Sequence, residues 1–145
     1  MIRQATTEDF AHVALLMTEL WPHHTVEEML EECYLLAEDG CVFLVAEEDD
    51  TPVGFAQCQL RHDYVEGTEH SPVGYLEGIY VRGNFRYKGI ARQLLAACES
   101  WAKEMGCLEF ASDCELNNTE SLAFHLSVGF EEANRIVCFT KKLDR

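Results

Sequence analysis

The sequence predicts an α/β protein built on a twisted, mixed β-sheet of six or seven strands with helices on both faces. Segments with helical spacing of apolar residues alternate with short strand-like runs, in the order β-α-α-β-β-β-α-β-α-β-β. One stretch reads as strand, crossover helix and strand, which predicts local parallel pairing. The 145 residues are 48% apolar, which is enough for the core of one domain spanning residues 1–145.

The N-terminal half is expected to contain a strand, two helices and a hairpin. Thr6 and Asp9 mark a helix start, and Thr25 with Glu28 has the form of a capping box that opens a second helix. Two apolar runs flank an Asp-Asp-Thr-Pro turn, which indicates antiparallel strands. The predicted elements are a strand at 2–5, a helix ending at 20, a helix from 25 to about 36, and strands at 41–47 and 53–61.

The C-terminal half is expected to begin with a polar loop at 62–73. A strand then leads into a basic, glycine-bounded turn and a long helix, which Gly106 terminates. Gly129 closes a further helix. The predicted elements are strands at 74–81 and 108–112, helices at 90–105 and 119–128, and final strands at 130–132 and 134–142.

Charge and hydropathy exclude several classes of protein. The formal net charge is −15, so nucleic acid is a poor partner and polycations are attracted, although acidity also serves solubility. The longest apolar run has six residues, 41–46, which is too short to span a membrane. The N-terminus is polar and acidic, unlike a signal peptide, which predicts a cytoplasmic protein.

The seven cysteines are interpreted as free thiols. Their number is odd, they form no C-x-x-C pair, and Cys98 and Cys138 lie in apolar runs, so burial in a reducing compartment is expected. The spacings do not fit a structural zinc site, and no metal is predicted.

The segment Arg86-x-x-Gly89-x-Ala91 is the strongest functional motif. It follows an apolar strand and opens a long helix, so small residues can let several N–H groups point into one concavity at the positive end of the helix dipole. Arg86 and Lys88 add cations. A glycine before a helix can also serve only to form a turn, but this context favours a pyrophosphate site.

This segment resembles motif A of the GNAT superfamily, which binds the pyrophosphate of acetyl-coenzyme A (acetyl-CoA). The run from Asn118 to Phe130 is similar to a second signature of that superfamily. The resemblance implies a GNAT-type sheet, with acetyl-CoA as cosubstrate for direct transfer to a primary amine. It implies that the pantetheine arm enters an opening between the strands at 76–81 and 108–112, with a backbone N–H near Ile79 at the oxyanion. The implied coenzyme contacts are Ile79, Tyr80, Val81, Arg86, Tyr87, Lys88, Gly89, Ile90, Ala91, Arg92 and Asn118.

His125 occupies the position where many members of the superfamily have a tyrosine that protonates the departing thiolate. A histidine can donate a proton near neutral pH. It can equally be a helix residue without a catalytic duty, and the sequence leaves both alternatives open.

A narrower resemblance covers nearly the whole chain. The segments 20–22, 61–67, 71–73, 76–79 and 111–113 resemble the bacterial aminoglycoside 6′-N-acetyltransferases, compact enzymes of antibiotic resistance that are often dimeric. The resemblance implies a homodimer that acetylates a small polycationic amine. It places substrate contacts on Trp21, Tyr64, Glu77 and Asp113, and on Asn134 where some relatives carry an acidic residue.

The chemistry of such a substrate suits the residue types. Several ammonium groups on hydroxylated rings require carboxylates and aromatic faces. Glu77 interrupts an apolar strand and Asp113 ends one, so either carboxylate can hold an ammonium and accept its proton. The structural alternatives are an outward-facing strand residue for Glu77, a turn or cap for Asp113, a core aromatic for Trp21 and a loop anchor for Tyr64.

Two other functions remain open at this point. The acceptor can be a polyamine, or an amine of a protein or peptide. Rates measured with a panel of amines would distinguish these acceptors. Alternatively, the chain can be a non-catalytic module that binds acetyl-CoA and releases no thiol with any amine.

Overall fold

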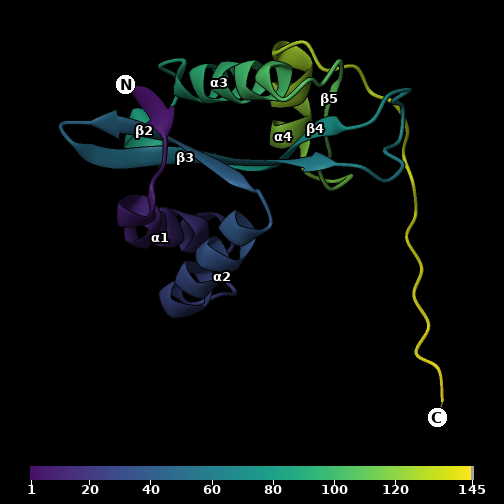
Figure 1. Cartoon of the computed structure of the whole chain (residues 1–145), viewed down its shortest axis with the longest axis horizontal. Coiled ribbons are helices and arrows are strands. Elements are labelled where there is room, and N and C mark those ends of the chain that lie inside the picture. The colour runs from purple at the N-terminus through teal and green to yellow at the C-terminus, as the bar shows by residue number, and fades with distance from the viewer. Residues whose placement is uncertain (145) are drawn as a thin grey trace. The chain divides into compact units, whose positions relative to one another are not determined.

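The computed structural model describes residues 1–144 and contains one mixed sheet with the strand order β1-β2-β3-β4-β5 (Figure 1). Neighbouring strands are antiparallel except β4 and β5, which are parallel. The chain divides into two compact units, residues 1–113 and the residues from 114 onward, and the whole sheet belongs to the first. The strands are β1 (Ile2–Gln4), β2 (Val42–Glu48), β3 (Thr51–Arg61), β4 (Val73–Val81) and β5 (Phe110–Ser112).

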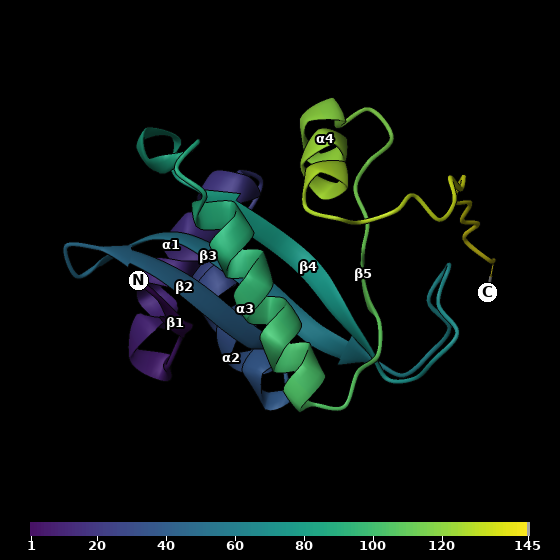
Figure 2. The ribbon, with the colours of Figure 1, turned by 90° about the horizontal axis from the view of Figure 1, so that it is seen from above.

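Helices lie on both faces of this sheet. A short 3-10 turn, η1 (Thr7–Asp9), leads into α1 (Phe10–Leu20), and α2 (Val26–Glu38) follows on the same face. After a second 3-10 turn, η2 (Gly83–Phe85), α3 (Ile90–Glu104) crosses the opposite face (Figures 1 and 2). The predicted fold class is therefore confirmed.

Local sequence signals fix the ends of these elements. Thr25 Oγ1 accepts a hydrogen bond from the Glu28 amide at 3.1 Å, so the predicted helix cap is present. Asp9 accepts the Thr6 amide at 2.7 Å and pairs with the guanidinium of Arg3 on β1. The pair holds the pKa of Asp9 well below its usual range, mainly through the hydrogen bond from Arg3. These contacts tie the start of the first helical segment to the edge of the sheet.

The largest core cluster joins α1 and α2 to one face of the sheet. Leu16 and Met17 of α1 are buried against Phe55 of β3, which is fully enclosed. Side chains at helical spacing on α1 thus meet side chains at alternate positions of the strands. This packing fixes the C-terminal end of α1, where Trp21 lies.

The second unit contains α4 (Thr119–Ser127), and its residues 130–144 form neither helix nor strand. The predicted strands at 130–132 and 134–142 are therefore not found, and the described residues give five strands in place of six or seven. Alternating apolar residues favour an extended chain, but a strand also needs the backbone of a partner, which a sequence pattern cannot supply.

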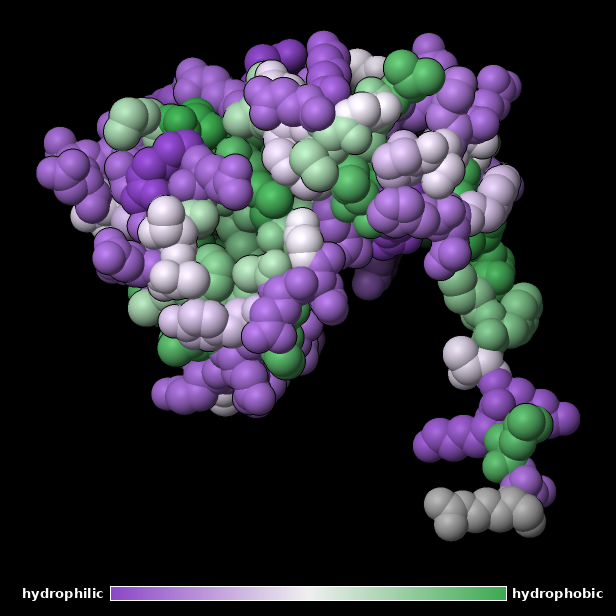
Figure 3. All heavy atoms as spheres, in the orientation of Figure 1, coloured by the Kyte–Doolittle hydropathy of each residue, from purple (hydrophilic) through white to green (hydrophobic). Residues whose placement is uncertain are grey.

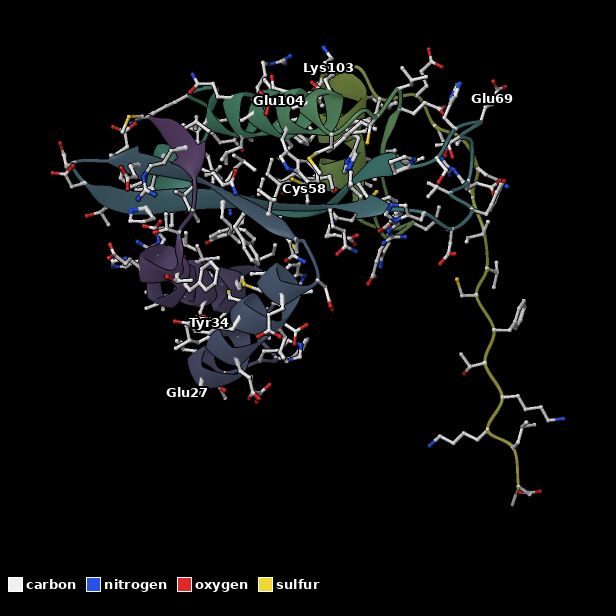
Figure 4. The ribbon with its side chains drawn as sticks, viewed as in Figure 1. Glu27, Tyr34, Cys58, Glu69, Lys103 and Glu104 are labelled. Carbon is white, nitrogen blue, oxygen red and sulfur yellow. The ribbon has the colours of Figure 1, made fainter. Side chains whose placement is uncertain are left out.

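Most cysteines are buried thiols, as expected. Five of the seven are buried, and Cys58 lies between the sheet and α3 (Figure 4). Burial raises the pKa of Cys33 to about 12. The expectation is wrong for Cys138, which is exposed, because an apolar run does not reveal whether anything covers it. Among the described residues, no helix combines the length and apolarity needed to cross a membrane.

Candidate active site

β4 extends beyond the end of β5 and leaves an open edge. The two strands pair at three positions, the last being Leu76 with Ser112, whereas β4 continues through residues 77–81. On its other side β4 pairs with β3, where Gln57 lies opposite Gly78 and Cys58 opposite Leu76. Glu77 is thus the extra residue of a β-bulge. This unpaired stretch of β4 lies where the resemblance implies the opening.

Two backbone amides of β4 point toward this opening. The Arg82 amide donates to the Val53 carbonyl on β3 at 2.9 Å. Because amide directions alternate along a strand, the amides of Val81 and Ile79 point away from β3. The Val81 carbonyl points the same way and accepts Arg86 Nε at 2.7 Å. Residues 79 and 81 therefore present their backbone groups to the open edge.

The turn before α3 has the backbone of an anion site. Tyr87 has φ 63° and Gly89 has φ 83°, and α3 begins at the next residue. Left-handed residues in such a turn direct successive amides into one concavity, and the helix dipole adds positive potential there. A Cβ at Gly89 would meet nothing within 4 Å, so glycine is needed for its backbone angle and not for space.

In this turn and in the first turn of α3, some side chains pack on the protein and others face solvent. The Arg86 guanidinium lies 5.4 Å from the Tyr80 ring, and Lys88 Nζ lies 5.5 Å from the Phe85 ring. Tyr87 is almost fully exposed, whereas Ile90 is buried. Ala91 is half-buried and Arg92 is exposed. Backbone amides and two cationic side chains at a helix N-terminus fit a pyrophosphate group.

The start of this turn is anchored to α1. Tyr80 Oη donates to Glu19 Oε1 at 3.0 Å, and Arg82 Nη2 donates to Glu19 Oε2 at 2.9 Å. The hydrogen bond from Arg82 is the main reason that the pKa of Glu19 is lowered. The Tyr80 side chain therefore holds α1 against β4, while its backbone belongs to the open edge.

Glu77 and Asp113 belong to one cluster, which is held by hydrogen bonds and one cation–π contact. Glu77 Oε2 accepts Gln59 Nε2 at 2.7 Å, and Glu77 Oε1 accepts Arg61 Nη2 at 2.9 Å. The Arg61 guanidinium stacks 3.4 Å from the centre of the Tyr75 ring, and Tyr75 Oη donates to Asp113. Burial raises the pKa of Tyr75, so the phenol keeps the proton that it donates. We call these five residues the Glu77 cluster.

Trp21 lies directly beside this cluster. A Cβ at Gly78 would approach Trp21 Cη2 to 2.8 Å, so the indole covers the residue that follows Glu77. Trp21 also meets Phe55 edge-on, with 6.2 Å between ring centres. The side chain is half-buried, so it is both a core aromatic and a wall of the candidate site.

The remaining predicted residues are placed differently. Tyr64 is 77% exposed and donates to Glu66 at 3.1 Å, outside the cluster. Within the second unit, Asn118 caps α4 through the Ser121 amide at 3.1 Å, and His125 Nδ1 lies 2.7 Å from the Ser121 carbonyl oxygen. The side-chain oxygen of Asn134 accepts the amide of the next residue at 2.8 Å.

Three residues of the cluster were not predicted. Gln59, Arg61 and Tyr75 surround the two carboxylates, yet none was proposed as a site residue. A signal was present for the two residues on β3, since polar residues at 57, 59 and 61 alternate along an otherwise apolar strand. That period places Gln57, Gln59 and Arg61 on one face of β3.

Comparisons with known proteins agree on one family. The model of the acetyltransferase (GNAT) family matches residues 2–130. An aminoglycoside N(6′)-acetyltransferase type 1 from Stenotrophomonas maltophilia is 46% identical over 145 residues, which cover 99% of this chain and 94% of the relative. The solved aminoglycoside N-acetyltransferase AAC(6′)-Iy in complex with CoA superposes with a TM-score of 0.94 at 38% identity, covering 99% of this chain and 95% of that one. The same enzyme with the bisubstrate analogue CoA-S-monomethyl-acetylneamine gives a TM-score of 0.93 at 38% identity, with 99% and 98% covered.

Proposed function

The chain belongs to the acetyltransferase (GNAT) family, and we propose that it transfers the acetyl group of acetyl-CoA to the 6′-amino group of aminoglycoside antibiotics. The observation that carries this proposal is the position of Glu77, a carboxylate on the bulge where the open edge of β4 begins and next to the residue that Trp21 covers. Relatives that share nearly the full chain length bear the name of this activity. Acetylation turns an ammonium into a neutral amide, so this activity modifies the antibiotic and supports resistance.

The coenzyme is assigned to the open edge and the turn before α3. The backbone of Ile79 and Val81 would pair with the pantetheine arm, and the turn from Arg86 to Gly89 would hold the pyrophosphate. Asn118 caps the helix of the second motif. The first turn of α3 completes the proposed coenzyme site with Ile90, Ala91 and Arg92.

Glu77 is the proposed acceptor of the proton from the attacking amine. Among the described residues, its Oε2 accepts three hydrogen bonds and its Oε1 only one, from Arg61. Oε1 therefore retains capacity for an ammonium N–H or a bridging water. The amide of Ile79 would stabilise the oxyanion as the neutral amine attacks the thioester. Trp21, Tyr64, Asp113 and Asn134 are the other proposed substrate contacts.

His125 is the proposed acid for the departing thiolate. Its Nδ1 lies 2.7 Å from the Ser121 carbonyl oxygen, which can only accept a hydrogen bond, so this contact fixes the orientation of the ring. A folded His125→Phe variant that keeps the wild-type kcat, where chemistry limits the rate, would exclude this role.

A thiol-release assay with purified protein and acetyl-CoA tests the function. We expect turnover with kanamycin and tobramycin, and a product whose added acetyl group lies on the 6′ nitrogen. Spermidine and a peptide are the comparison acceptors. Turnover that favours spermidine or the peptide would contradict the aminoglycoside assignment, and coenzyme binding without thiol release would indicate a non-catalytic module.

We also propose a homodimer. The C-terminal segment exposes apolar atoms (Figure 3), and Val137 and Phe139 are 77% and 87% exposed. β-branched and aromatic residues in an extended segment favour pairing with a second copy of the chain. Light scattering should give twice the chain mass, and Phe139→Lys should shift the protein toward the monomer. A monomeric wild-type protein would overturn this assignment.

We propose that the chain folds as one N-acetyltransferase domain and that it acts in the cytoplasm. The family match extends from residue 2 to 130 and so includes residues of both units. All seven cysteines are free, which suits a reducing compartment. Proteolysis that releases a stable fragment ending near residue 113 would contradict the single domain, and recovery of the protein from a periplasmic fraction would contradict the location.

A further inference from the structure

A second polar region lies next to the Glu77 cluster, in a cleft of about 600 Å³ between α1, α2 and β3. Both views of the ribbon place α2 along the same face of the sheet as α1 (Figures 1 and 2). Trp21 lines the cleft as well as touching Gly78. We call this space the α2 cleft.

The floor of the α2 cleft carries an unused hydrogen-bond acceptor. Gln57 lines the cleft and is only 7% exposed, and its Oε1 is buried without a hydrogen-bond partner among the described residues. Buried polar atoms are nearly always satisfied, so a lone acceptor at the base of a cleft points to a ligand that brings a donor.

The rim of the α2 cleft is negatively charged. Glu28, Glu31 and Glu32 of α2 line it, and the lining that the structure describes includes no lysine or arginine. His24 lies 3.1 Å from Glu28 and is the one basic group there. Carboxylates above a buried acceptor, beside an indole face, suit an ammonium-bearing, hydroxylated ring.

The α2 cleft lies close to the site of the reacting amine. Gln57 and Gln59 are two residues apart on β3 and share one face, which corresponds to about 7 Å along the strand. Gln59 donates to Glu77 at 2.7 Å. A multi-ring substrate whose 6′ amine reaches Glu77 can therefore place another ring over Gln57.

We propose that the α2 cleft is a subsite for an ammonium-bearing ring of the acceptor other than the ring that is acetylated, with Gln57 Oε1 accepting from that ring and the α2 carboxylates holding its charge. This inference rests on the proposed function. It adds to that function by naming the part of the substrate that the cleft binds. Its action is on binding and not on the acetyl transfer itself.

Steady-state rates of three variants test the subsite. Gln57→Leu removes the acceptor atom, and Glu31→Gln with Glu32→Gln removes two rim charges from exposed positions where folding is not at risk. Glu27→Gln removes one charge from the same helix, but Glu27 projects away from the sheet and does not line the cleft (Figure 4). The acceptors are tobramycin, with several rings, and methyl 6-amino-6-deoxyglucoside, with one.

We expect the first two variants to raise the KM for tobramycin about tenfold while kcat, the KM for acetyl-CoA and the KM for the one-ring amine stay within twofold. Glu27→Gln should match the wild type. An unchanged KM for tobramycin in the rim variant, or an equal rise for both acceptors, would overturn the subsite.

Failure of the proposed function gives a different result, because the wild type itself would then not acetylate tobramycin. In that case calorimetric titration with tobramycin decides the matter. Binding that Glu31→Gln with Glu32→Gln weakens supports the cleft, and binding that is absent or unchanged overturns it.

Discussion

The Glu77 cluster and the α2 cleft lie side by side on one face of the sheet but differ in how their polar groups are satisfied. In the cluster, Glu77 is 18% exposed and both of its oxygens accept hydrogen bonds, so its charge is matched by Arg61. In the cleft, Gln57 Oε1 has no partner among the described residues, and the rim carries an excess of carboxylates.

This difference suggests two roles: the Glu77 cluster positions the reacting amine, and the α2 cleft attracts the charged substrate. A carboxylate held by three donors has a fixed orientation, which suits the group that must meet the reacting amine. Exposed carboxylates without a matching cation attract charge over a longer range but impose little geometry. Variants of the two regions should therefore differ in kind, the first lowering kcat/KM for any amine and the second raising KM for polycations.

The largest effect is expected from Glu77→Gln. The amide keeps the shape but deletes the charge, and it leaves the Arg61 guanidinium unmatched where an ammonium must bind. The loss should be about 1.5–3 kcal/mol, or about ten- to a hundredfold in kcat/KM, the scale of a hydrogen bond to a charged group. Initial rates with tobramycin and with a one-ring amine measure it, and both should fall.

The double variant Glu77→Gln with Arg61→Met separates lost attraction from new repulsion. If the unmatched guanidinium contributes, Arg61→Met should recover part of the activity in the Glu77→Gln background although it lowers activity in the wild type. Strictly additive losses would show that Arg61 only positions the carboxylate.

The next largest effect is expected from Gly89→Ala, which leaves both acceptor regions intact. At φ 83° an L-residue costs roughly 1–2 kcal/mol, so the turn should relax and its amides lose their common direction. The Kd for acetyl-CoA should rise about tenfold by calorimetry, with little change in the KM for tobramycin. Gly83→Ala is the matched control, since Gly83 has open space around it and no positive φ. Equal effects of the two variants on the Kd for acetyl-CoA would contradict the assignment of the anion site to this turn.

A smaller effect is expected from Asp113→Asn. Asp113 is exposed, and exposed charge pairs contribute about 0.2–1 kcal/mol, or about 1.4- to fivefold in kcat/KM. Tyr75→Phe is the control, because it removes the hydroxyl that Asp113 accepts but leaves the carboxylate. If both variants behave alike, Asp113 acts through Tyr75 and does not contact substrate.

Local signals predicted the parts of the fold that depend on neighbours in sequence. The cap at Thr25 and the turn at Gly89 depend on residues within one helical turn, and both are present. The strands after Phe130 depend on a distant backbone, and alternating apolar residues could not supply it. The same limit explains Cys138, whose burial was inferred from its neighbours alone.

The sequence also anticipated some of the residues that the structure brings together in the candidate site. Glu77 and Asp113 stand out as charges at the ends or interruptions of apolar strands, and both lie in the cluster. Arg61 was missed because its importance arises from cross-strand contact with Glu77, and this register depends on a bulge that no local pattern specifies. The unused acceptor of Gln57 is likewise a property of packing and not of sequence.

The smallest effect is expected from salt, and it distinguishes the two regions most directly. The Debye length falls from about 10 Å at 0.1 M salt to about 3 Å at 1 M, so exposed charges lose influence before partly buried ones do. The α2 carboxylates are exposed, whereas the side chain of Glu77 is 18% exposed and already matched by Arg61. Between low and high salt the KM for tobramycin should therefore rise by about two- to threefold in the wild type and in Glu77→Gln, but hardly at all in Glu31→Gln with Glu32→Gln. Initial rates at a fixed, saturating acetyl-CoA concentration measure this, with the one-ring amine as the acceptor that should show little salt dependence. A salt response that disappears in Glu77→Gln and persists in the rim variant would assign the long-range attraction to the cluster and reverse the comparison.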